Sequence, residues 1–179
     1  MNSREMAKKL HSVAGRGCFA ITGSGIQAIS DLFSEPGASR TILDAQVPYS
    51  RLALEEFVGV PTDQHVSADE AKLMANAALK RAQHLTQSDE GDEPLFGVGC
   101  TAAVATDRVR RGEDRAHIAW TNGTHSGGML IRFDKQVRTR ADEDAVVSAI
   151  VLNSIAMALE IDERLDLHVL ETERLYEFN

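Results

Sequence analysis

The chain has 179 residues, of which 43% are hydrophobic and 26% are charged. A chain of this length is expected to form a single α/β domain over residues 1–179, burying roughly 70% of its unfolded surface. Its 19 basic and 27 acidic residues give a net charge of −8. This balance argues against general nucleic-acid binding, because neutralisation of phosphates by Lys and Arg supplies most of that affinity.

Two further classes are disfavoured by the pattern of apolar residues and cysteines. No apolar run approaches the 18 residues of a membrane span, and the N-terminus lacks the apolar stretch of a signal peptide. Cys18 and Cys100 are too few for a disulfide framework or a thiolate zinc site. We therefore expect a cytoplasmic protein without a membrane segment or a bound metal.

The first part of the chain alternates between helix and strand patterns. We predict a helix over 4–14 with Ser3 as a candidate cap, a buried strand over 17–22 that enters a glycine-rich turn at 23–25, and a helix over 26–34. A strand over 41–47 and a helix over 50–58 follow.

The clearest helix begins at Ser67. Ser67 and Glu70 match the capping box, in which the two side chains satisfy each other's backbone amides. Small and apolar residues then recur at steps of three and four, at Ala68, Ala71, Ala75, Ala78, Ala82 and Leu85. This spacing predicts an amphipathic helix to about residue 85 with a face that permits close packing.

Strand patterns dominate after a polar loop at 86–94. In the predicted strand 95–105, alternate residues fall on two different faces. The apolar face has Phe96, Val98, Cys100, Ala102 and Val104, and the face of small residues has Gly97, Gly99, Thr101, Ala103 and Ala105. Strands at 115–121 and 129–133, a long apolar helix at 142–160 and a strand at 165–170 complete the chain. These elements predict a three-layer α/β/α sandwich with a mixed sheet.

Several short motifs occur in an order and spacing typical of one family. They are Pro36-Gly-Ala-Ser39, Val47-Pro-Tyr-Ser50, Val58-Gly-Val60 and Val66-Ser-Ala-Asp-Glu-Ala71 with Met74-Ala75. The chain resembles the C-terminal domain of the CinA family over about residues 5–160. The resemblance implies that family's α/β fold. Characterised members are nicotinamide mononucleotide deamidases, which hydrolyse the carboxamide of the nucleotide.

The catalytic positions of that family are replaced here. Its serine falls at Ile21 or a neighbour, its lysine at Leu54 and the threonine of its next motif at Gly99. A hydroxyl nucleophile needs a neighbouring base or a lowered pKa, and a leucine supplies neither. The resemblance therefore implies a diverged member that keeps the fold and a nucleotide pocket, needs no cofactor and lacks the known amidase machinery.

Four arginines follow the 95–105 strand within eight positions, at Arg108, Arg110, Arg111 and Arg115. Arginine recognises phosphate bidentately, and ligands of open α/β sheets gather beyond the carboxyl ends of strands. One interpretation is an anion clamp for a nucleotide or another phosphorylated metabolite. The other is a solvated loop, because acidic residues interleave with the arginines.

The same region supplies the candidates for any remaining catalysis, Thr101, Asp107 and His117. Thr101 projects to the small face of its strand, where a ligand or a helix fits. His117 shares a face with Arg115 and is either an acid–base group or a half-exposed strand histidine. Cys100 lies on the apolar face, which favours a packed thiol over a nucleophile.

Further ligand contacts are suggested elsewhere in the chain. The turn carrying Gly23 and Ser24, which follows Thr22, offers backbone amides to an anion or is a plain tight turn. Arg40 and the pair Tyr49-Ser50 are pocket candidates by their place in the family motifs. A second arginine group, Arg132, Arg138 and Arg140, is interpreted as solvated surface.

Two functional hypotheses follow. The first is a CinA-like domain that binds a nucleotide or a related phosphorylated small molecule, with hydrolysis of a non-peptide amide as the reaction if it catalyses one. The alternative is a non-catalytic sensor or interaction module that partners a nucleotide-metabolising enzyme. In either case the helices 68–85 and 142–160 are candidate surfaces for a homo-oligomer.

Overall fold

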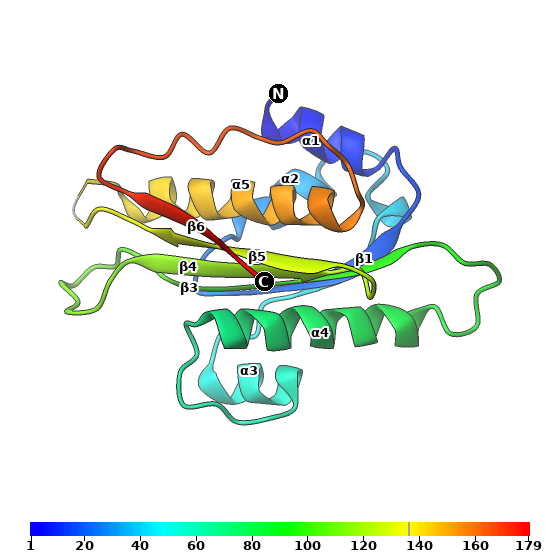
Figure 1. Cartoon of the computed structure of the whole chain (residues 1–179), viewed down its shortest axis with the longest axis horizontal. Coiled ribbons are helices and arrows are strands. Elements are labelled where there is room, and N and C mark those ends of the chain that lie inside the picture. Colours follow the sequence, from blue (N-terminus) through cyan, green and yellow to red (C-terminus); the bar gives the residue numbers. More distant parts are fainter. Residues whose placement is uncertain (136) are drawn as a thin grey trace.

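A six-stranded mixed sheet separates two layers of helices in the computed structural model, which describes residues 1–135 and 137–179 (Figure 1). The strand order is β2-β1-β3-β4-β5-β6. The strands β1 (Arg16–Thr22), β2 (Ile42–Gln46) and β3 (Leu95–Ala103) are parallel. The strands β4 (Arg115–Thr121), β5 (Ser126–Arg132) and β6 (Arg174–Phe178) extend the sheet by antiparallel pairing. The predicted three-layer α/β/α sandwich is confirmed.

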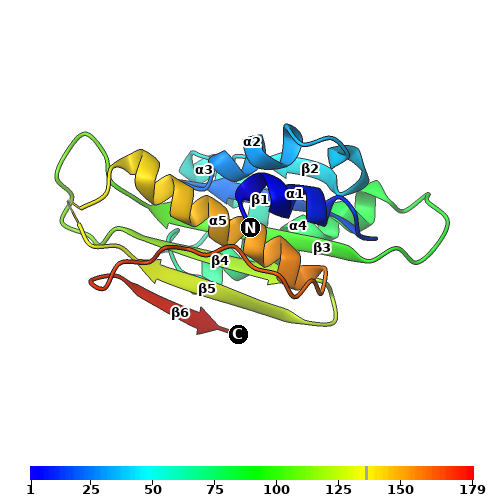
Figure 2. The same cartoon turned by 90° about the horizontal axis from the view of Figure 1, so that it is seen from above.

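One face of the sheet is covered by α1 (Ser3–Leu10), α2 (Gln27–Phe33) and α5 (Arg140–Ala158). The helix α5 is buried along most of its length, and residues such as Val151 and Ile155 join the main hydrophobic core. Residues 159–173 then return across this side of the molecule and lead into β6 at the sheet edge (Figure 2). No helix in the described ranges is long and apolar enough to cross a membrane.

The opposite face is covered by α4 (Ala68–Leu85), with α3 (Arg51–Val58) packed beneath it. The predicted bounds of α4 are confirmed, and Ala71, Ala75 and Ala78 are buried in this layer. A Cβ placed on Gly97 would collide with the Ala75 carbonyl and the Leu79 amide. The small face of β3 therefore serves to let the backbone of α4 approach the sheet.

Several predicted boundaries shift by a few residues. The first helix ends at Leu10, and its cap is Asn2 instead of Ser3: the Asn2 side chain accepts from the Glu5 amide. The third strand ends at Ala103, and a short 3-10 turn, η1 (Ala38–Arg40), precedes β2. The loop at 86–94 lies between α4 and β3 as predicted.

The predicted strand at 165–170 is wrong. Leu165, Leu167 and Val169 do pack on the core, which explains their alternation with polar residues. The backbone of Leu165, however, bonds to the Asn153 side chain of α5, with Asn153 Oδ1 accepting at 2.8 Å and Nδ2 donating at 3.1 Å. The last strand is β6 instead, and it pairs with β5.

Candidate functional site

The loop at 104–114 carries most of the arginine cluster from the end of β3 to the start of β4. Its four arginines take different directions. Arg108 and Arg110 line a pocket on the α5 side of the sheet, whereas Arg111 lies outside it beside Glu113. Arg115 instead donates to the Val66 carbonyl at 3.0 Å. The sequence cluster is therefore divided between three environments.

The pocket has a volume of about 370 Å³ and lies between this loop and the segment that enters α5. That volume falls in the lower part of the range for small-molecule sites. Its lining is formed by Ala105, Thr106, Asp107, Arg108, Val109, Arg110, Asp114, Lys135, Arg138, Thr139 and Arg140. Two members of the second arginine group, Arg138 and Arg140, thus line the same pocket as the first, which corrects their interpretation as plain solvated surface.

Two of the five cations in this lining are neutralised by carboxylates. Arg110 pairs with Asp114 and also donates to the Val104 carbonyl at 3.2 Å. Arg138 makes a bidentate pair with the buried Glu173, with its Nε and Nη2 at 2.9 Å from the two carboxylate oxygens. Both arginines therefore also stabilise the wall of the pocket through these contacts.

The remaining three cations, Arg108, Lys135 and Arg140, have no carboxylate partner among the residues that the structure describes. Arg140 donates to the carbonyls of Ala105 and Gly23 at 3.1 and 3.0 Å, and Lys135 donates to the Arg110 carbonyl. Hydrogen bonds to carbonyls orient these side chains without cancelling their charge. The five cations of the lining outnumber its two carboxylates, Asp107 and Asp114, so the pocket carries a net positive charge within an acidic chain.

The glycine-rich turn after β1 is already filled by an anion from within the chain. Asp144 of α5 accepts hydrogen bonds from the amides of Gly25, Ile26 and Gln27 at 2.7, 3.1 and 3.0 Å, and from the Ser24 hydroxyl at 3.0 Å. Burial alone would raise the pKa of Asp144, but these bonds outweigh it and lower the pKa. The amides that the sequence suggested for a ligand hold α2 to α5.

Gly23 shows why this turn needs glycine. Its φ of +88° is left-handed, and a Cβ there would collide with the Ala102 carbonyl. The Gly23 carbonyl accepts a hydrogen bond from Arg140, so the turn lies next to the pocket. The Thr22 side chain, however, is buried, and the Ser24 hydroxyl donates to Asp144.

The predicted catalytic residues do not assemble at one place. Asp107 borders the pocket, whereas Thr101 and His117 are neighbours across β3 and β4 on the α4 face of the sheet. Thr101 is fully buried, and its hydroxyl donates to the His65 carbonyl. His117 is buried rather than half-exposed; burial, then Arg115 and Arg132, lower its pKa to about 4. It is therefore neutral at physiological pH.

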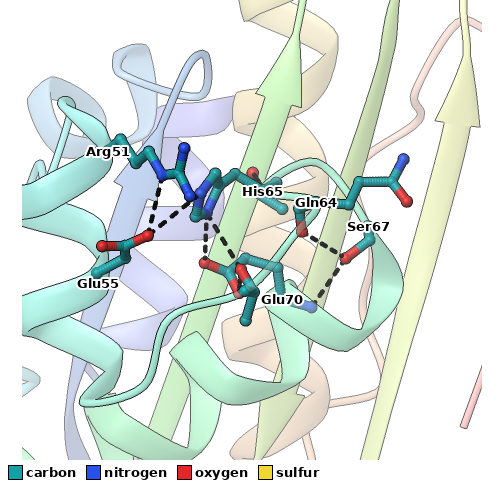
Figure 3. Close-up of polar contacts among 8 residues, drawn as sticks. Arg51, Glu55, Gln64, His65, Ser67 and Glu70 are labelled. Carbon is teal, nitrogen blue, oxygen red and sulfur yellow. Dashed lines mark hydrogen bonds and ion pairs between the residues drawn. The ribbon is translucent and has the colours of Figure 1, made fainter.

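A polar network that the sequence did not indicate lies beside these residues at the start of α4 (Figure 3). The buried Glu70 carboxylate accepts from the Thr62 hydroxyl at 3.0 Å and lies 3.3 Å from His65 Nδ1. His65 Nε2 is 3.8 Å from Glu55, which pairs with Arg51. The network fastens the loop before α4 to both α3 and α4.

This network also corrects the predicted capping box. Ser67 does accept from the Glu70 amide at 3.1 Å, but the Glu70 side chain turns toward Thr62 and His65 instead of the Ser67 amide (Figure 3). Only half of the reciprocal motif is formed.

The remaining candidates lie apart from the pocket. Ser50 caps α3 by accepting from the Ala53 amide at 3.2 Å, and the adjacent Tyr49 is 66% exposed. Arg40 precedes β2 and donates to the His11 carbonyl at 3.2 Å, at the end of the parallel strands opposite the Gly23 turn. Leu54, at the position of the family's lysine, is buried with Ala20 and Met74.

The cysteines are packed thiols, as expected for Cys100. Both side chains are buried. Burial raises the pKa of Cys18 to about 12 and that of Cys100 still further. Neither thiol is therefore ionised as a nucleophile would be.

Comparisons with known proteins support the fold alone. No family model matches the chain, and no curated protein matches it. Among solved structures, the competence/damage inducible protein CihA from Agrobacterium tumefaciens is 18% identical, with a TM-score of 0.68 over 90% of this chain and 96% of that chain. A competence-damaged protein (CinA) superfamily protein from Escherichia coli is 16% identical, with a TM-score of 0.66 over 88% and 87% of the two chains. A competence or damage-inducible protein from Enterobacter asburiae is 17% identical, with a TM-score of 0.66 over 89% and 98%. The chain thus has the fold of the CinA superfamily proteins.

Proposed function

We propose that the chain binds a phosphorylated small molecule, such as a nucleotide, in the pocket between the 104–114 loop and the start of α5. The observation that carries this proposal is that Arg108, Lys135 and Arg140 border one cavity without a carboxylate partner in the described ranges. Guanidinium groups bind phosphate through paired, charge-assisted hydrogen bonds, and a neighbouring ammonium adds a point charge.

A matched pair of variants tests the pocket. Arg108→Ala is expected to weaken the binding of pyrophosphate or of a nucleotide by about 1.5–3 kcal/mol, the usual loss for a hydrogen bond to a charged group. Arg111→Ala removes an arginine from the same loop but outside the pocket, and it should leave the affinity unchanged.

A thermal-shift screen of nucleotides first selects the probe. Isothermal titration then compares the affinities of the two variants with that of the wild type. Equal affinities of Arg108→Ala and the wild type would contradict the proposed site and favour the interpretation of these arginines as solvated surface residues.

We infer that binding occurs without the deamidase chemistry implied by the resemblance. Leu54 is a buried apolar side chain, the Thr101 hydroxyl donates to a backbone carbonyl, and the amides after Gly23 are taken by Asp144. These groups are therefore engaged in structural contacts, which favours the alternative of a non-catalytic sensor or partner of a nucleotide-metabolising enzyme.

Nicotinamide mononucleotide supplies the direct test of this second inference. Purified protein incubated with it should release no ammonia above the level of a heat-denatured control. Sustained turnover would show that an amidase site remains and that the replaced positions do not account for the chemistry.

A further inference from the structure

Two buried carboxyl groups meet at the pocket, where Asp114 is part of the lining and Glu143 contacts the lining residue Ala105. Asp114, 5% exposed, lies immediately before β4, and Glu143, 0% exposed, lies in the first turn of α5. Their side chains are within hydrogen-bond contact of each other. One Glu143 oxygen accepts from the Ala105 amide at 3.3 Å, while the other has no donor among the described residues.

The charges around this pair leave one carboxyl uncompensated. Asp114 has Arg110 as its partner, so a second ionised carboxylate would add an unpaired negative charge inside the protein. Carboxyl groups that share a site retain a proton between them for this reason. Burial, with the charge of Asp114 beside it, raises the pKa of Glu143 to about 7.

Besides Asp114, the charged side chains of the pocket lining are those of Asp107, Lys135 and four arginines, Arg108, Arg110, Arg138 and Arg140. Arg110 faces the carboxyl pair from the loop, and Arg138, held by Glu173, faces it from the segment before α5. Arginine stays protonated around neutral pH, and no histidine lines the pocket. The shared proton is therefore the charge in this wall that changes near pH 7.

We propose that the Asp114–Glu143 pair couples anion binding in the pocket to proton uptake. With the proton in place the wall adds no further negative charge to the pocket, and without it the wall repels an anion. Thermodynamic reciprocity requires the bound anion to hold the proton more firmly. This coupling rests on the proposed function, because it needs an anion to bind in this pocket.

Sulfate is a suitable probe, because its own charge is constant between pH 6 and 8.5. Isothermal titration of the wild type should give a dissociation constant about tenfold higher at pH 8.5 than at pH 6, from one added charge near the ligand. Titrations near pH 7 in two buffers of different ionisation enthalpy should show net proton uptake on binding.

The isosteric variant Glu143→Gln should bind sulfate with the same affinity at both pH values. Glu113→Gln, which changes an exposed carboxylate of the same loop, should keep the pH dependence.

The wild-type measurement decides the proposal even if Glu143→Gln fails to fold. Equal wild-type affinities at the two pH values would overturn the coupling and leave the anion site standing. Absence of sulfate binding at both would overturn the coupling together with the proposed function.

Discussion

Replacing Asp144 by alanine should lower the free energy of unfolding by about 3 kcal/mol or more, because hydrogen bonds to a charged group each contribute roughly 1.5–3 kcal/mol and the freed amides lose their acceptor. The carboxylate holds the amides of Gly25, Ile26 and Gln27 and the Ser24 hydroxyl. Its loss therefore loosens the attachment of α2 to α5. Chemical denaturation of the variant and the wild type measures the difference.

The pH dependence of this loss has a definite sign. The pKa of Asp144 is lower in the folded protein than in the unfolded chain, so its contribution is complete above the unfolded pKa, about 4. The contribution should disappear as the pH falls through the lower, folded pKa, where wild type and variant should converge.

Asp142→Asn is the matched control on the same helix. Asp142 is an exposed member of the capping box with Thr139, and its replacement should lower the free energy of unfolding much less than the replacement of Asp144 does. Equal losses for the two variants would contradict the role given to Asp144.

Gly97→Ala should destabilise the fold by about 3 kcal/mol, the upper part of the range for overpacking, because the added methyl meets backbone that cannot move alone. The atoms in its way are the Ala75 carbonyl and the Leu79 amide of α4. The helix must therefore shift away from the sheet to admit one methyl group. Thermal and denaturant unfolding report the loss.

Gly112→Ala is the control for this substitution. Gly112 lies in the exposed loop, where an added Cβ meets only the end of the Arg110 side chain at 3.7 Å. Its replacement should change the stability by less than about 1 kcal/mol in either direction. A tolerated alanine at position 97 would show that α4 does not rest on the backbone of β3.

The fold was largely predictable because its strongest signals are local. The cap at Ser67 and the alanine spacing after it define α4, and the alternation along 95–103 defines β3 and its two faces. The last strand was not predictable in the same way. The alternation of apolar and polar residues over 165–170 indicates burial on one side, but it does not show whether the backbone pairs with a strand. The true edge strand, Arg174–Phe178, is mostly exposed and has only a weak alternation of apolar and polar residues.

The site was predictable only in part, because it depends on contacts between distant residues. The cluster of arginines in the sequence identified Arg108. That Arg140 lines the same pocket depends on the start of α5 lying beside the loop. The turn amides were visible in the sequence, whereas their partner Asp144 is 119 residues from Gly25. The carboxyl pair likewise joins Asp114 to Glu143 across 29 positions, a contact that no spacing rule reports.

A crystal structure of the protein grown with pyrophosphate tests the central claim most directly. The proposed function predicts density for the anion between the 104–114 loop and α5, within hydrogen-bond distance of the Arg108 or Arg140 guanidinium. The same crystals grown from Arg108→Ala protein should show the density weakened or absent. An anion bound elsewhere, with this pocket occupied by water alone, would contradict the assignment of the site.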